Sequence, residues 1–69
     1  MSKSVYKIIE MVGSSTVSWE DATQAAVESA ELSLRDLRIA EVIKLDMKLQ
    51  DGGPLYRARV HLSFKILSD

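Results

Sequence analysis

The chain has 69 residues, a formal net charge of −1 and no cysteine. A chain of this size forms one small domain over residues 1–69, and it buries only about 60% of the surface that its unfolded form exposes. The lack of cysteine excludes disulfides and thiolate metal sites, and a single histidine excludes a multi-histidine zinc site within one chain. Oligomerisation, an oxygen-ligated ion or an unusually well-packed core remain as ways to stabilise the domain.

The charge balance and the hydropathy pattern limit the partners. Nucleic-acid affinity comes largely from excess Lys and Arg, so the net charge of −1 argues against a nucleic-acid partner. No apolar run approaches the roughly 20 residues that span a bilayer, so we expect no membrane partner. The N-terminal sequence MSKSVYKII enters a strand pattern at once and lacks the apolar core of a signal peptide. We therefore expect a soluble cytoplasmic protein.

Residues 5–13 are rich in β-branched and aromatic side chains and end at Gly13, a pattern that predicts a first strand. Because successive side chains of a strand point to opposite faces, this strand is apolar on both of its sides. One side carries Val5, Ile9 and Met11, and the other carries Tyr6, Ile8 and Val12.

A helix is predicted from Trp19 to about Asp36, because the apolar residues there recur with a helical period. Ser18 precedes it as the N-cap and lies three residues before Asp21, which makes an approximate capping box. Trp19 is predicted to pack on the sheet or on a neighbouring chain rather than to stack on a ligand. The apolar face consists of small residues that would let the helix lie close on a sheet, and it is predicted to contain Ala22, Ala25, Ala26, Ser29, Ala30, Ser33, Leu34 and Leu37.

Two further strands follow the helix. One is predicted from about Arg38 to Leu49, the turn sequence QDGGP comes next, and the last strand runs from Leu55 to about Leu67. These two strands should form a long antiparallel hairpin. In the first of them, one side would carry Ile39, Ile43, Leu45 and Met47, and the other Ala40 and Val42. In the last strand, apolar residues alternate with a basic stripe of Arg57, Arg59, His61 and Lys65.

The predicted order is β-α-β-β, an α+β fold in which an antiparallel sheet wraps on one helix. One helix covers one face of the sheet, yet the first two strands are apolar on both faces. Exposed apolar patches of that size mark interaction surfaces. The residues therefore predict a symmetric homo-oligomer, in which another copy of the chain covers the second face.

Several sequence blocks resemble the dodecin family over nearly the whole chain. They are VYKIIEMVGSS, the Ser-capped helix, RDLRIAEV, DGG and YRARVHLSFKI. Dodecins are small β-α-β-β proteins that assemble as hollow dodecamers and sequester flavins, in some members together with coenzyme A. The resemblance therefore implies a hollow homo-dodecamer that is not an enzyme.

The chain departs from the flavin-binding members of that family in three segments. Those members stack a Trp on the flavin in the segment that is RDLRIAEV here, which places Ile39, without a π face, at the Trp position and Ala40 at the next aromatic. Where the family has a Gln after a Tyr, this chain has Arg57, which only donates hydrogen bonds. Asp46 replaces a basic residue of the family and would repel a flavin phosphate. Flavin is therefore not the expected cofactor.

The blocks SWEDA, RIAEVIKLDM, YR and SFK are instead similar to a second branch, the calcium dodecins. This resemblance implies a dodecamer that binds or sequesters a small ligand or ion, with Ca²⁺ favoured over flavin. The alternative is a store for flavin, as riboflavin or FMN, and coenzyme A with a rebuilt pocket. A purely structural interaction module and a small enzyme are further alternatives, although no convergent acid–base pair in the sequence supports an enzyme.

Asp46 and Glu41 are the candidate metal ligands, because they are acidic residues in an otherwise apolar strand. Their opposite parity predicts that they point to opposite faces of the sheet. Calcium takes six to eight oxygen ligands, so a symmetry axis would have to bring several carboxylates together. Two alternatives stay open: ion pairs with the basic stripe of the last strand, or an ion site on the helix around Glu20 and Asp21.

Overall fold

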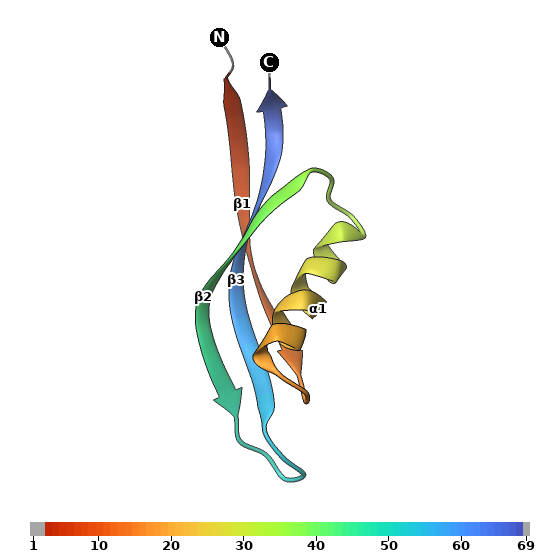
Figure 1. Ribbon diagram of the computed structural model, residues 1–69, viewed down its shortest axis with the longest axis vertical. Helices are drawn as coiled ribbons and strands as arrows, with labels where there is room; N and C mark the ends of the chain where they lie inside the picture. The colour runs from red at the N-terminus through yellow and green to blue at the C-terminus, as the bar shows by residue number, and fades with distance from the viewer. Residues whose placement is uncertain (1–2, 69) are drawn as a thin grey trace.

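The computed structural model describes residues 3–68, in which one helix lies on one face of a three-stranded antiparallel sheet (Figure 1). The elements are β1 (Ser4–Ser15), α1 (Trp19–Glu31), β2 (Leu37–Lys48) and β3 (Leu55–Ser68). The strand order is β1-β3-β2, so both β1 and β2 are edge strands that run antiparallel to β3. The predicted β-α-β-β order and α+β class are therefore confirmed.

The core lies between α1 and the central strand β3. Ala58, Val60 and Leu62 are at most 1% exposed, and they face the helix. The residues that alternate with these three along β3 include the basic stripe and point to the opposite face, as the sequence predicted, because successive side chains of a strand point to opposite faces. We call the two faces of the sheet the helix face and the outer face.

Helix α1 begins as predicted and ends five residues earlier than predicted. Ser18 is the N-cap, and its hydroxyl accepts a hydrogen bond from the backbone N–H of Asp21 at 3.0 Å. The helix ends at Glu31, and the chain turns before β2 through Asp36, which has a φ of 60°. The predicted end was wrong because Leu34 and Leu37 pack on the core from the connection and the next strand, where burial rather than helical structure explains their spacing.

The small face of α1 allows an unusually close approach to β1. The buried helix residues are Ala22, Ala26 and Ala30, whereas the predicted face members Ala25 and Ser29 are exposed.

Gly13 lies directly beneath this alanine face. A Cβ at that position would lie 1.9 Å from the carbonyl oxygen of Ala22, so only glycine fits there. The sequence predicted that the first strand ends at Gly13, and this prediction was wrong. Strand β1 continues to Ser15, and the glycine is the point where the helix contacts it.

Strand β2 does not keep the simple alternation that the sequence predicted. Its register against β3 shifts between Leu37 and Ile39 and again between Val42 and Lys44, so that Ile43 is an extra residue. Such a bulge reverses the faces of all residues that follow it. Consequently Leu45 and Met47 lie on the helix face together with Ala40 and Val42. Among the apolar residues of β2 that are paired with β3, only Ile39 lies on the outer face.

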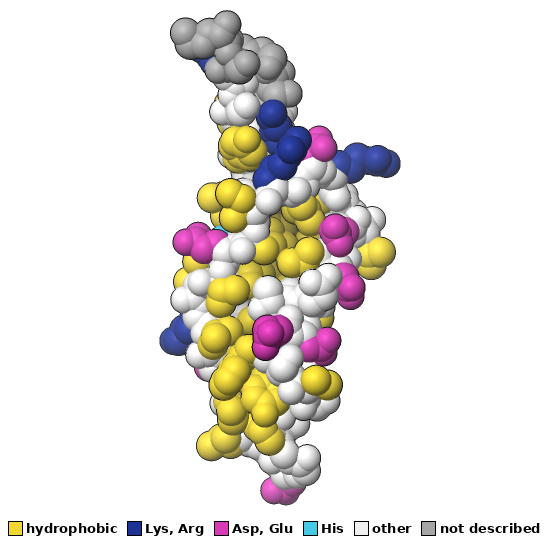
Figure 2. Space-filling view, in the orientation of Figure 1, with side chains coloured by type: hydrophobic (Ala, Val, Ile, Leu, Met, Phe, Trp, Pro, Cys, Tyr) yellow, Lys and Arg dark blue, Asp and Glu magenta, His cyan; other side chains and the backbone are white. Residues whose placement is uncertain are grey.

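Much apolar surface of β2 is uncovered. Helix α1 packs mainly on β1 and β3 and touches β2 least. Val42, Leu45 and Met47 are 47%, 48% and 39% exposed, and Figure 2 shows hydrophobic side chains gathered along the β2 side of the molecule beside the helix. The chain exposes 5082 Å², whereas a compact protein of its mass exposes about 4,300 Å².

The molecule is elongated, with extents of 54 × 21 × 14 Å and a radius of gyration of 14.3 Å, against about 11 Å for a compact chain of this length. No helix in the described part of the chain is long and apolar enough to cross a membrane.

Candidate functional site

The outer face of the sheet carries the candidate site residues in rows that run across the three strands. Cross-strand partners point to the same face, so the register places them together. Asp46 lies opposite Arg57, Glu41 lies opposite His61, and Ile39 lies opposite Ser63. Strand β1 completes these rows with Ser14 beside Arg57, Glu10 beside His61 and Ile8 beside Ser63.

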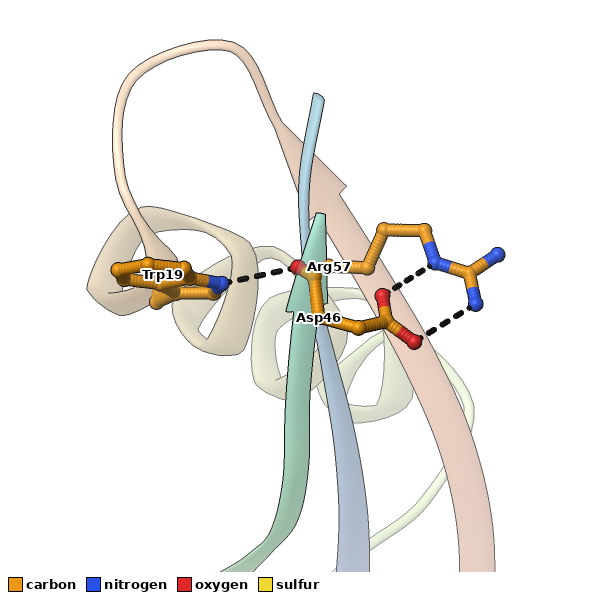
Figure 3. A network of polar contacts seen from close by, with 3 residues as sticks. All are labelled: Trp19, Asp46 and Arg57. Atoms are coloured by element: carbon orange, nitrogen blue, oxygen red, sulfur yellow. Dashed lines mark hydrogen bonds and ion pairs between the residues drawn. The ribbon is translucent and has the colours of Figure 1, made fainter. Parts of the chain in front are cut away.

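Asp46 and Arg57 form a bidentate ion pair at one end of this face (Figure 3). The Nε and Nη2 atoms of Arg57 donate to Oδ1 and Oδ2 of Asp46 at 2.6 and 2.9 Å. The hydrogen bond from Arg57, helped by its charge, lowers the pKa of Asp46 below its ordinary value of 3.8. The same hydrogen bond raises the pKa of Arg57. The ion-pair alternative is therefore the one that a single chain adopts for Asp46.

Trp19 anchors the start of the helix to the same residue from the other side of the sheet. Its Nε1–H donates to the backbone oxygen of Asp46 at 2.9 Å (Figure 3), and its ring meets Tyr56 edge to face with centroids 5.0 Å apart. Edge-to-face pairs of this kind contribute about 0.5–1.5 kcal/mol of stability beyond the contribution of the apolar area that they bury. The prediction that Trp19 packs on the sheet is confirmed.

Glu41 and Asp46 point to the same face, so the prediction that they point to opposite faces was wrong. The extra residue Ile43 lies between them and reverses their relative parity. Their environments differ. Asp46 is paired with Arg57, whereas the carboxylate of Glu41 makes no hydrogen bond or ion pair with any residue of the range 3–68.

His61 makes a contact that the sequence analysis missed. Its Nε2 lies 3.1 Å from Oε2 of Glu10 on β1. Glu10 has the parity of Tyr6, Ile8 and Val12 in the first strand, and this polar residue among apolar ones was the signal that could have revealed it.

A hollow of about 360 Å³ opens on the outer face around Ile39. Ile39 and Ile8 are 65% and 60% exposed there, and Tyr6 supplies an aromatic ring from β1. The residues that line it are Tyr6, Ile8, Arg38, Ile39, Glu41 and Ser63.

Arg57 lies away from this hollow. It is six residues from Ser63 along β3, which is about 20 Å in an extended strand. A single chain therefore does not bring Ile39 and Arg57 together.

The described residues contain no group of three His, Cys, Asp or Glu side chains arranged to hold a metal ion. At the helix start, Asp21 accepts a hydrogen bond from the Ser15 hydroxyl at 2.6 Å, and Ser15 also accepts one from the N–H of Val17 at 2.9 Å. That carboxylate therefore ties the turn between β1 and α1.

The fold and the hollow define a small βαββ protein with one helix-covered face and one open sheet face. The family model described as Dodecin matches residues 5–67, and the chain belongs to the dodecin family. It is 44% identical over 64 residues to a protein named calcium dodecin from Mycobacterium tuberculosis, covering 91% of this chain and 90% of the relative.

Solved structures agree with this assignment. A calcium dodecin from Mycobacterium tuberculosis, described as having a novel calcium-binding site, matches with a TM-score of 0.82 and 42% identity over 91% of each chain. The tt0972 protein from Thermus thermophilus matches with a TM-score of 0.87 and 32% identity, covering 94% of this chain and 97% of the other. A dodecin from Streptomyces coelicolor matches with a TM-score of 0.89 and 29% identity over 97% of each chain.

Proposed function

We propose that this protein is a non-catalytic homo-dodecamer that binds or sequesters a small ligand or ion, Ca²⁺ rather than flavin. The proposal is supported by the residue at the hollow on the outer face. At the hollow, where flavin-binding relatives stack a Trp, this chain has an exposed aliphatic Ile39. An aliphatic side chain provides no π surface for an isoalloxazine ring. The relative named calcium dodecin supports the choice of ion.

The assembly is proposed from the surface that one chain leaves open. Apolar side chains are exposed on both faces of the sheet, including Ile8 and Ile39 on the outer face and Val42 and Leu45 on the helix face. Extended apolar patches on a protein surface mark contacts with other proteins. Copies of the same chain are the proposed cover, and the number twelve comes from the family.

Asp46 remains the first candidate ligand and Glu41 the second. Ca²⁺ would have to compete with Arg57 for the carboxylate of Asp46, and it needs six to eight oxygens, so several copies must contribute. An ion that binds only the assembled state stabilises that state by mass action. Millimolar Ca²⁺ should therefore raise the melting temperature, and Mg²⁺ should raise it less because it holds its water ligands more strongly.

Three variants test these ligands by thermal unfolding with and without Ca²⁺. Asp46→Asn should abolish the calcium-induced shift and leave the oligomer intact. Arg57→Gln should enlarge the shift because it releases the carboxylate, and Asp51→Asn in the hairpin turn is the matched control that should keep it. An unmodified protein whose melting does not respond to millimolar Ca²⁺ would end the ion proposal.

A flavin store with a rebuilt pocket is the second candidate, because Tyr6 places one aromatic ring at the hollow. Riboflavin fluorescence separates the two. The calcium proposal expects little quenching at micromolar protein, whereas the flavin proposal expects strong quenching that Tyr6→Leu removes. Ile39→Trp with Arg57→Gln should improve flavin binding if the backbone of the pocket is retained.

A further inference from the structure

A second hollow lies on the helix face, between the end of α1 and the start of β2, where Figure 2 shows hydrophobic side chains at the surface. Its volume is about 160 Å³. The partly buried Val27 and Leu37 line it, together with Ala40 and the buried Leu62. The hollow stays open because α1 ends at Glu31 and contacts β2 less than it contacts the other strands. We call it the helix-end hollow.

Two side chains of opposite charge border the helix-end hollow. Glu31 is the last residue of α1, and Arg38 is the second residue of β2. Both are exposed, and neither makes a hydrogen bond or an ion pair with the other or with any further residue of the range 3–68. Asp46 and Arg57 differ, because they pair with each other within the chain. The hollow therefore has an apolar floor and two charges that are open to a ligand.

The local structure around each charge suits it to a ligand group of opposite sign. Glu31 lies where the free carbonyl groups of the helix end already carry partial negative charge, and the last turn of α1 contains no basic residue. This end of the hollow therefore favours a cationic group. Arg38 is the extra residue where the register of β2 shifts between Leu37 and Ile39. Bulges re-aim side chains beside binding sites, so the shift explains why Arg38 borders the hollow from the edge of the sheet.

We propose that the helix-end hollow binds a small α-amino acid with an apolar side chain, such as leucine. The carboxylate of the amino acid accepts hydrogen bonds from the guanidinium of Arg38, and its ammonium group donates to the carboxylate of Glu31. Its side chain lies against Val27, Ala40 and Leu62. The volume is sufficient, because an apolar protein cavity of about 150 Å³ holds a molecule of benzene.

An amino acid fits the hollow better than simpler ligands do. A simple anion would pair with Arg38 and leave Glu31 unpaired, and a metal ion would do the reverse. A purely apolar molecule would leave both charges without a partner. The site also lies apart from the proposed ion site, since Asp46 is eight residues beyond Arg38 along β2, roughly 25 Å in an extended strand. The inference therefore goes beyond the proposed function and does not depend on Ca²⁺.

Isothermal titration calorimetry with L-leucine tests the site on the unmodified protein. We expect saturable binding at millimolar concentration or below. Leucinamide lacks the carboxylate and isocaproate lacks the ammonium group, so each should bind about fivefold more weakly, the effect of one exposed ion pair. Leucine that does not bind, or two analogues that bind as tightly as leucine, would overturn the inference.

Three variants locate the ligand in the hollow. Glu31→Gln and Arg38→Gln should each raise the dissociation constant of leucine about fivefold. Ala40→Leu fills the hollow and should abolish binding. Far-UV circular dichroism confirms that each variant is folded, and the two charge variants change only exposed side chains.

Glu28→Gln on α1 and Arg35→Gln in the connection are the matched controls, which should bind leucine like the unmodified protein. Charge variants that bind like these controls would overturn the site. A hollow that a side chain of another copy fills would leave leucine unbound and would overturn it as well. The response to Ca²⁺ and the number of chains are separate measurements, so either failure leaves the proposed function standing.

Discussion

Strands β3 and β2 belong to one hairpin but have opposite surroundings. Strand β3 has a strand on each side and the helix on one face, and its inward residues Ala58, Val60 and Leu62 are almost fully buried. Strand β2 is an edge strand with two register shifts, and of its residues only Leu37 and Asp46 are even partly buried. One strand has its neighbours within the chain, and the other lacks most of them.

The composition of β2 is nevertheless that of a covered strand. It carries Ile39, Val42, Ile43, Leu45 and Met47, yet each of these is at least 39% exposed. A natural chain that leaves so long an apolar edge open would be prone to aggregation. The difference between the strands is therefore best explained by neighbours that other copies supply.

The largest difference between the two strands should appear in a pair of matched truncations, Leu62→Ala on β3 and Leu45→Ala on β2. Leu62 is 1% exposed, so its truncation should lower the free energy of unfolding by about 2–5 kcal/mol at any protein concentration. Leu45 is half exposed in one chain, so its truncation should act mainly on assembly and become more damaging on dilution. Thermal unfolding at several concentrations distinguishes them. Equal effects of both variants at every concentration would contradict the comparison.

Gly13→Ala should have the next largest effect, because it pushes the helix away from the sheet. The added methyl group would lie 1.9 Å from the Ala22 carbonyl oxygen, which belongs to the backbone and cannot rotate away. Overpacking of this kind costs about 1–3 kcal/mol or more. Denaturant unfolding should show the loss, and Ser14→Ala on the outer face is the control. A Gly13→Ala protein as stable as the control would mean that the helix does not lie so close.

The different surroundings of β2 and β3 also explain which parts of the fold could be predicted from the sequence. The alternation of β3 and the N-cap at Ser18 were predicted correctly, because local pattern and burial agree there. The end of the helix was misplaced, since Leu34 and Leu37 have helical spacing but pack from outside the helix. The predicted faces of the β2 residues after Val42 were wrong, because a one-residue bulge cannot be recognised from a sequence that is apolar on both sides of it.

The candidate site was predictable only in part. The positions of Asp46 and Arg57 on neighbouring strands followed from the hairpin, and the structure joins them in an ion pair. The unpaired carboxylate of Glu41 could not be predicted, because the neighbouring strand carries a basic stripe, yet no residue of the range 3–68 pairs with Glu41. Sequence patterns describe a strand well when its neighbours belong to the same chain.

The smallest effect should come from the Asp46–Arg57 pair and should depend on pH. The pKa of Asp46 is lowered in the folded chain, so the pair stabilises the fold above the ordinary pKa of 3.8 and this contribution is lost as the pH falls through the lowered value. Asp46→Asn should therefore melt at a slightly lower temperature than the unmodified protein at pH 7, and the difference should vanish in strong acid. Asp51→Asn is the control. A difference that grows in acid would contradict this assignment.

The number of chains in the purified protein shows whether other copies cover the open surfaces of β2. Native mass spectrometry at micromolar concentration reports the number of chains and any retained ion in one experiment. We expect an assembly of twelve chains that stays intact on dilution to that concentration. A stable, soluble monomer with its apolar faces open to water would contradict it.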